Sequence, residues 1–405
     1  MAVDRISTAN AYDGAINNLL QRQTTLSSTQ EQMTSGKRVG KASDDPTAAA
    51  RAERARALEA RTTASERAVD ASSNAMTLTE SALGDASDLI QQARELVVGA
   101  GDSSYSDQER KSIANQISAI RNELLSVANR PDGQGGYVFS GQGSGGAPFV
   151  DQPGGVQFKG VGGSVNVASD EPLPLTLDGG NVWLQASSGN GVFDTKNVNS
   201  AGAWVDSGTV TDPSKLTGST YDLQFSVSGG TTTYSVMKDG VATSIANQPY
   251  TSGQSIAVDG MSFTISGTPA NGDQFETTPS QKNLSVFDTL DNIVKQLSTP
   301  SKGGATVTRA VQDGLRNIDQ VSAQISSARS FAGTTLTRLD GVKGRLDATQ
   351  LSAETSRSDA EDLDMVKALS SFNSQQTGYS AALQSYATIQ KLSLFQYLKD
   401  RKSVV

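Results

Sequence analysis

The sequence predicts an α+β fold in which long, antiparallel, coiled-coil-like helices from both chain ends flank an inserted all-β domain. Three observations predict it. Apolar residues recur at helical spacing over residues 5–130, and again over residues 284–398. Between these arms, residues 132–283 are rich in Gly, Thr, Asn and Pro and alternate between apolar and polar residues as short strands do.

Both helical arms repeat their apolar residues every seven positions. A sustained heptad keeps one seam of a helix facing a partner, which is the requirement of coiled-coil packing. An ordinary helical bundle inside one globular domain would produce similar stripes. The heptad rows are Val69, Met76, Leu83, Ile90 and Val97 in the first arm, and Val311, Ile318, Ile325, Ala332, Leu339 and Leu346 in the second.

Local signals mark where the elements begin and end. Asp45 precedes Pro46, so its side chain can cap a helix that has the proline in its first turn. Ser106 and Glu109 have the spacing of a capping box. Asp259–Gly260 separates two alternating segments and predicts a β-hairpin. The glycine-rich stretch 133–146 lacks a phosphate-binding motif and is interpreted as a flexible joint between helices and strands.

The composition excludes most catalytic chemistry. The chain contains no His and no Cys, so imidazole bases, thiolate nucleophiles and sulfur-bound metals are absent. Ser43–Asp44–Asp45 and the acidic group at residues 359–364 could suggest a cation site, but helix caps explain them more simply. We therefore expect a protein that is not an enzyme, with no catalytic, cofactor or metal site.

Charge and hydropathy exclude two classes of partner. The formal net charge is −8, and residues 138–283 hold twelve acidic and five basic side chains, which leaves the helical arms almost neutral. A basic nucleic-acid footprint is therefore missing. The chain has no apolar run of about 18 residues, so membrane insertion is not expected, and its start does not resemble a cleaved signal peptide.

The extreme ends carry thin apolar rows. Each row is too narrow to stabilise an isolated helix, because nucleation is unfavourable and packing must supply the difference. We expect these ends to order against each other or against neighbouring copies, although two terminal helices docked on the body is an alternative. The expected subunit-interface residues are Tyr12, Ile16, Leu19, Leu26, Met33, Leu369, Phe372, Tyr379, Leu383, Tyr386, Leu392 and Phe395.

Motifs at both ends resemble the signatures of the flagellin family. MTSGKRVGKASDDPTAAARA, residues 33–52, is similar to the N-terminal signature, and residues 358–398, ending in KLSLFQYL, are similar to the C-terminal one. That ending, GGYVFSGQ at 135–142 and the segment 266–290 resemble the family's hook–filament junction proteins more than its filament subunits. Residues 144–265 show little of this resemblance.

The resemblance implies three parts. Terminal polymerisation helices, 1–44 and 359–405, would be disordered or loosely packed in the monomer. Residues 45–131 and 284–358 would form a helical bundle domain, and residues 132–283 an outward-facing β domain. The cationic tail 399–405 departs from the family pattern and leaves the packing of the last helix open.

The resemblance also implies a function. The chain would be a structural adaptor linking hook to filament in the extracellular part of the bacterial flagellum, exported unfolded without a cleaved signal. About eleven copies would form a ring-like layer by family analogy, in a helical assembly. Its partners would be an adjoining hook-side junction protein, flagellin, and a cytoplasmic export chaperone on the C-terminal helix.

Two other functions remain open at this level. The chain could be a filament flagellin, which shares both terminal signatures. A secreted adhesin or glycan-binding protein could use Trp183 and Trp204 of the β domain as stacking platforms. Burial of these aromatic residues in the core of small β units is the simpler interpretation.

Overall fold

A computed structural model describes residues 2–102, 104–167, 172–300 and 304–400, with side chains described from Tyr12 to Gln390 apart from residues 304–305 and 389. The chain divides into two compact units. Unit 1 comprises residues 1–66 and 343–405, and unit 2 comprises residues 67–342. Each unit is described by itself.

Long helices form both arms, and short strands fill the middle of the chain. The helices are α1 (Ala2–Ser35), α2 (Pro46–Ala100), α3 (Asp107–Ala128), α4 (Gly179–Leu184), α5 (Val286–Ser298), α6 (Gly304–Glu361) and α7 (Met365–Asp400), with a 3-10 turn at Pro213–Lys215. The strands are β1 (Phe149–Gln152), β2 (Gly155–Phe158), β3 (Asn166–Val167), β4 (Leu173–Pro174), β5 (Ala186–Ser187), β6 (Phe193–Asn197), β7 (Ala203–Val205), β8 (Thr209–Val210), β9 (Tyr221–Ser228), β10 (Thr231–Lys238), β11 (Val241–Ala242), β12 (Gln248–Pro249), β13 (Ser255–Val258), β14 (Met261–Gly267), β15 (Gln274–Pro279) and β16 (Lys282–Leu284).

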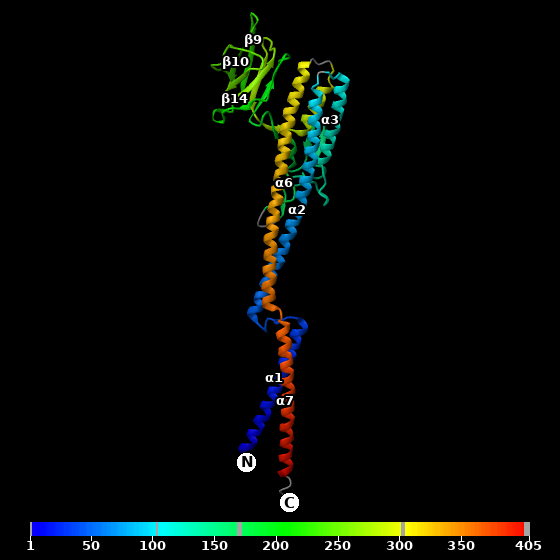
Figure 1. Ribbon diagram of the computed structural model, residues 1–405, viewed down its shortest axis with the longest axis vertical. Helices are drawn as coiled ribbons and strands as arrows, with labels where there is room; N and C mark the ends of the chain where they lie inside the picture. Colours follow the sequence, from blue (N-terminus) through cyan, green and yellow to red (C-terminus); the bar gives the residue numbers. More distant parts are fainter. Residues whose placement is uncertain (1, 103, 168–171, 301–303, 401–405) are drawn as a thin grey trace. The chain divides into compact units, whose positions relative to one another are not determined.

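In unit 2 the heptad rows of α2 and α6 meet in one hydrophobic core from Leu83 to Val97 and from Val311 to Ile325. Met76, Leu83 and Val97 are fully buried, as is Ile325 on α6. Ion pairs join Arg94 Nε to Asp319 Oδ1 at 2.8 Å and Arg329 Nε to Glu80 Oε1 at 2.7 Å, so residue numbers rise on one helix as they fall on the other. The two helices are therefore antiparallel, side by side with α3 (Figure 1).

Helix α3 begins where the sequence predicts. The Ser106 hydroxyl accepts a hydrogen bond from the Glu109 amide, and the Glu109 carboxylate accepts from the Ser106 amide, which confirms the capping box. After the last turn, the Asn129 side chain exchanges hydrogen bonds of 2.8 and 2.9 Å with the backbone of Phe149. Because Phe149 starts β1, this amide joins the helix end to the first strand.

An arginine inside unit 2 ties three elements together. Arg121 of α3 is 5% exposed, pairs with Asp151 of β1, and lies 3.1 Å from Asp291 of α5. Hydrogen bonding to Arg121 lowers the pKa of Asp151. The Arg121 guanidinium also lies over the Phe287 ring, with 5.7 Å between the guanidinium carbon and the ring centroid. A buried cation needs such partners, because unpaired charge is costly away from water.

Residues 192–279 form β layers with a core of their own. The larger sheet has the order β11-β10-β9-β15-β6, with β12 on β10, and the smaller has β13-β14-β7, with β8 on β14. Every pairing among the described strands is antiparallel. Asp259 and Gly260 have φ of 40° and 80° in the tight turn between β13 and β14, which confirms the predicted hairpin.

The preceding segment, residues 138–186, packs against the helices instead. Val138, Phe139 and Trp183 belong to the core of α2, α3, α5 and α6. At Gly141, whose φ is 66°, an added Cβ would lie 1.9 Å from the Val161 carbonyl oxygen, so only glycine fits. The stretch expected to be a flexible joint is thus anchored in the helical core, because Val138 and Phe139 are buried there among other apolar side chains.

Unit 1 contains the α1–α7 pair, the start of α2 and the end of α6. Helices at both ends of the chain with antiparallel strands between them confirm the predicted α+β class. Within the described part of the chain, no helix combines the length and apolar character needed to cross a membrane.

Candidate assembly interface

The two terminal helices pack on each other along an antiparallel seam. The Tyr386 hydroxyl donates to the Tyr12 hydroxyl at 2.5 Å, and Gln390 Nε2 donates to both hydroxyls at 3.2 Å. Further along the pair, Thr29 Oγ1 donates to Gln375 Oε1 at 3.0 Å. The start of α1 and the end of α7 consequently lie at the same end of the pair (Figure 1). Donation by Tyr386 lowers the pKa of Tyr12 and raises that of Tyr386.

The structure divides the expected interface residues into two sets. The half-buried residues are Ile16, Leu19, Leu26, Met33, Phe372, Tyr379 and Tyr386. Exposed residues are Tyr12 at 38%, Leu369 at 52% and Leu383 at 43%. The side chains of Leu392 and Phe395 lie outside the described ones. A two-helix seam is too small to bury these rows, so apolar surface stays available to other chains. Their role as a subunit interface stays a prediction.

Unit 1 also exposes apolar side chains that the sequence reasoning missed. They include Val366, which is 82% exposed. None of them belongs to the apolar rows that the sequence analysis assigned to the helices. A search for every large apolar residue left over after the heptad rows are assigned would have found them. They are Leu20, Leu58, Leu351, Met365 and Val366.

Both helical arms are interrupted in unit 1, between α1 and α2 at residues 36–45 and between α6 and α7 at residues 362–364. The two breaks lie next to each other, and we call them together the joint. The amides of Arg38 and Val39 donate to the Glu361 carbonyl oxygen at 2.7 and 3.3 Å. In return, the Leu363 amide donates to the Gly36 carbonyl oxygen at 3.0 Å. Gly36 has a φ of 70°, so the chain leaves α1 through the left-handed region that favours glycine. The α1–α2 loop and the α6–α7 break are therefore one hydrogen-bonded structure.

One buried carboxylate organises the charges at this joint. Glu361, the last residue of α6, is 2% exposed. Its oxygens contact Lys37 Nζ at 3.4 Å, Arg357 Nη1 at 3.0 Å and the Arg56 guanidinium. These cations come from the loop, from α6 itself and from α2. Burial of the carboxylate strengthens these pairs, and Glu361 thereby connects the α1–α2 loop, α2 and α6.

Three other acidic residues at the joint are helix and loop caps. Asp45 Oδ1 accepts from the Ala48 amide at 3.0 Å, and Asp44 Oδ2 accepts from the Lys41 amide at 2.8 Å. Asp364 Oδ1 likewise accepts from the Lys367 amide at 3.1 Å in the first turn of α7. Among the side chains described, no three acidic residues are arranged to hold a metal ion. The predicted cap of Asp45 is confirmed.

The Asp45 cap should make the start of α2 sensitive to acid. The Ala48 amide above all lowers the pKa of Asp45 from 3.8 to about 2. A carboxyl group with a depressed pKa stabilises the folded state above its ordinary pKa, and this contribution is lost as pH falls from 3.8 towards about 2. The protection factors of the amides after Pro46, which are exchange rates corrected for the intrinsic effect of pH, should therefore fall over that range. Asp45→Asn, which still caps but does not titrate, should flatten the dependence; an unchanged dependence would contradict the assignment.

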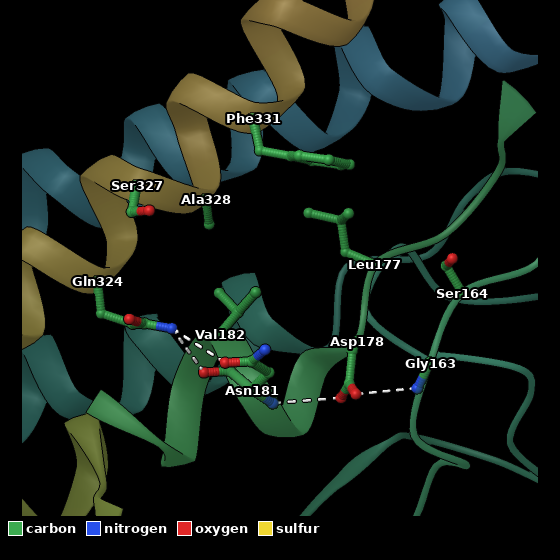
Figure 2. A pocket seen from close by; sticks show the side chains of 10 residues that line it. All are labelled: Gly163, Ser164, Leu177, Asp178, Asn181, Val182, Gln324, Ser327, Ala328 and Phe331. Atoms are coloured by element: carbon green, nitrogen blue, oxygen red, sulfur yellow. Dashed lines mark hydrogen bonds between the residues drawn. The ribbon is translucent and has the colours of Figure 1, made fainter. Parts of the chain in front are cut away.

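A cavity of about 420 Å³ in unit 2 offers no chemistry of its own. It lies between α4 and α6, and Figure 2 shows its lining. Asp178 already accepts from the amides of Gly163 and Asn181 at 2.9 and 3.2 Å, and Gln324 Nε2 donates to the Asn181 carbonyl oxygen at 3.0 Å. The polar groups of Asp178, Asn181 and Gln324 are therefore engaged with one another or with the backbone, and the rest of the lining is serine hydroxyls and apolar side chains, with Phe331 51% exposed.

Comparison with known proteins identifies the helical arms. A model of the bacterial flagellin N-terminal helical region matches residues 6–144, and a model of the bacterial flagellin C-terminal helical region matches residues 315–398. The chain belongs to the flagellin family. A model of the D2-like domain of flagellar hook-associated protein 1 matches residues 192–279, the segment with a β core of its own.

Within the flagellin family, the chain is similar to hook-associated proteins over most of its length. It is 26% identical to flagellar hook-associated protein 3 of Escherichia coli over 399 residues, 98% of this chain and 100% of the relative. The crystal structure of FlgL from Xanthomonas campestris is 29% identical, with a TM-score of 0.65 over 72% of this chain and 98% of that one. The crystal structure of hook-associated protein 3 from Legionella pneumophila is 25% identical, with a TM-score of 0.70 over 75% of this chain and 97% of that one.

Proposed function

We propose that this flagellin-family chain is a structural adaptor subunit of the bacterial flagellum that links hook to filament. The observation that supports this best is the end-to-end match to flagellar hook-associated protein 3, whose whole length the alignment covers. The match of residues 192–279 to a domain of hook-associated protein 1 favours a junction subunit over a filament flagellin. Burial of Trp183 in the helical core weakens the adhesin alternative.

Assembly would use the terminal helices. We propose a three-part division: polymerisation helices at 1–44 and 359–405, a helical bundle at 45–131 and 284–358, and a β domain at 132–283. Within the last part, residues 138–186 pack against the bundle, and residues 192–279, which have a core of their own, would face outward. The rows from Tyr12 to Met33 and from Leu369 to Phe395 would pack between copies in a ring-like layer. The exposed side chains of Leu369 and Leu383 support this, because a chain acting alone would leave them in water.

Export and partners follow from the same proposal. The chain would leave the cell unfolded and lie outside it between a hook-side junction protein and flagellin. A cytoplasmic chaperone would cover the apolar row of α7 before export, since an exposed apolar row promotes aggregation. The chain would act by burying apolar surface and would not catalyse a reaction.

A deletion strain tests the proposal. Cells that lack this gene should release flagellin into the medium and carry hooks without filaments, and the full-length chain should restore filaments and swimming. A truncation without residues 1–44 and 359–405 should remain soluble and monomeric yet fail to restore them. Secretion of no flagellin at all by the deletion strain would instead identify a filament subunit. Full swimming with the truncation would contradict the assembly role of the ends.

A further inference from the structure

A row of unpaired arginines surrounds an exposed leucine at the start of α2. Arg51, Arg54, Leu58 and Arg61 are spaced by three, four and three residues, so they share one face of the helix. All are exposed, Leu58 at 38%. The three arginines have no hydrogen-bond or ion-pair partner among the described residues, unlike Arg56, which pairs with Glu53 and Glu361. We call this face the basic row.

The basic row borders a groove within unit 1. The groove has a volume of about 430 Å³, and α6 contributes Ala353, Ser356 and Asp359 to its other wall. Small residues on that wall leave room beside Leu58 for an apolar side chain of another molecule. The lining carries the unpaired guanidinium groups of Arg51 and Arg54 and one carboxylate, that of Asp359, so the groove as a whole is cationic.

A row of opposite charge lies on another face of α6. Asp347, Leu351 and Glu354 follow at steps of four and three residues, and all are exposed, Leu351 at 65%. None of them lines the groove. Neither carboxylate has a partner in the part of the chain that the structure describes, whereas Glu59 is paired with Arg357. We call this face the acidic row.

The two rows match in spacing, charge and chemistry. Each places one exposed leucine between unpaired charges of a single sign, and each belongs to unit 1. Neighbouring charges do not neutralise them, since Glu53 is bonded to Arg56, and Lys343 and Arg345 have partners of their own. Because the rows lie on different faces, one copy of the chain can use both at once.

We propose that the basic row of one copy binds the acidic row of the next copy, with Leu351 entering the groove beside Leu58. The contact rests on the proposed function as an assembling subunit and identifies its partner surface. It is heterologous, so repetition produces a ring or a helical layer and not a closed two-fold dimer. Charge complementarity sets the register of neighbouring subunits, and buried apolar surface adds affinity.

Charge reversal in the deletion strain tests the pairing. Arg51→Glu, Arg54→Glu and Arg61→Glu together, or Asp347→Lys and Glu354→Lys together, should each reduce filament-bearing cells by about tenfold or more, because like charges then face each other. A chain with both reversals should recover filaments, since complementarity returns. Asp88→Lys with Glu123→Lys, which reverses exposed charges elsewhere, is the matched control and should swim normally. The proposal would be overturned if the chain with both rows reversed gave no more filament-bearing cells than the chains with one row reversed.

Cysteine crosslinking gives a readout that does not depend on the charge variants. The chain has no cysteine, so Leu58→Cys and Leu351→Cys introduce the only thiols. In isolated hook–filament structures, oxidation of a chain with both substitutions should produce a ladder of disulfide-linked multimers, whereas either substitution alone should leave monomers. Monomers from the double variant, with the protein present in those structures, would refute the contact and leave the adaptor function standing. Absence of the protein from those structures would refute both.

Discussion

Trp183→Ala should destabilise unit 2 by about 3–5 kcal/mol, the range for removal of a buried tryptophan. Trp183 is fully buried in the helical core. Its ring stacks on Phe287 with 6.0 Å between centroids and meets Phe139 edge-on at 5.4 Å. The substitution would leave a cavity where α4, α5 and the strand segment meet, and rigid neighbours could close it only in part. Urea unfolding followed by circular dichroism would measure the loss.

Two further variants make this result specific. The indole N–H of Trp183 is buried without a hydrogen-bond acceptor among the described residues. Trp183→Phe removes that donor together with some volume, so its cost should stay below about 1.5 kcal/mol. Trp204→Ala changes the half-buried tryptophan of the β layers and should cost less than Trp183→Ala. Equal losses for the two alanine variants would contradict the assignment of Trp183 to the helical core.

Glu361→Gln should loosen the joint of unit 1 by about 1.5–3 kcal/mol, the range for a hydrogen bond to a charged group. The substitution keeps the shape of the side chain but removes the charge that Lys37, Arg56 and Arg357 share. Breaking a fully buried ion pair costs about 3–5 kcal/mol. We expect less here, because the side chain of Arg357 is 30% exposed and water can replace part of the interaction.

Hydrogen exchange locates the effect. The amides of Arg38 and Val39, which donate to the Glu361 carbonyl oxygen, and that of Leu363 should exchange faster in the variant. Glu53→Gln is the matched control, because Glu53 pairs with the same Arg56 while its own side chain is 69% exposed. It should leave these amides unchanged. Equal acceleration in both variants would show that Arg56 pairing in general, and not the buried carboxylate, holds the joint.

Periodic and local signals were sufficient for the elements of the fold. The row from Val69 to Val97 is buried as a seam, since a heptad pattern alone determines which helix face can meet a partner. The Ser106 cap and the Asp259–Gly260 turn were predictable for a similar reason, because each depends on residues close in sequence. The position of residues 138–186 was not predictable from the sequence, since Phe139 and Trp183 could have been buried in the core of the helices or in the core of the β layers.

The candidate assembly surface was predictable only in part. The sequence indicated which apolar rows lie on α1 and α7, but not that Leu383 is exposed while Tyr386 is half-buried in the seam. That difference depends on how two helices approach each other. Glu361 looked like one member of an acidic helix start, and only the meeting of loop, α2 and α6 makes it a shared partner of three cations.

The sequence by itself determined the helical arms, the β-rich middle, the absence of imidazole and thiol chemistry, and the motifs of the flagellin family. These properties depend on residue type and on short or periodic spacing, and both are present in the sequence before any tertiary contact forms. The tertiary structure decided which core holds residues 138–186, how Glu361 closes the joint, and that unpaired arginines and carboxylates occupy different faces of unit 1. These depend on contacts between segments hundreds of residues apart, which spacing along the chain does not specify.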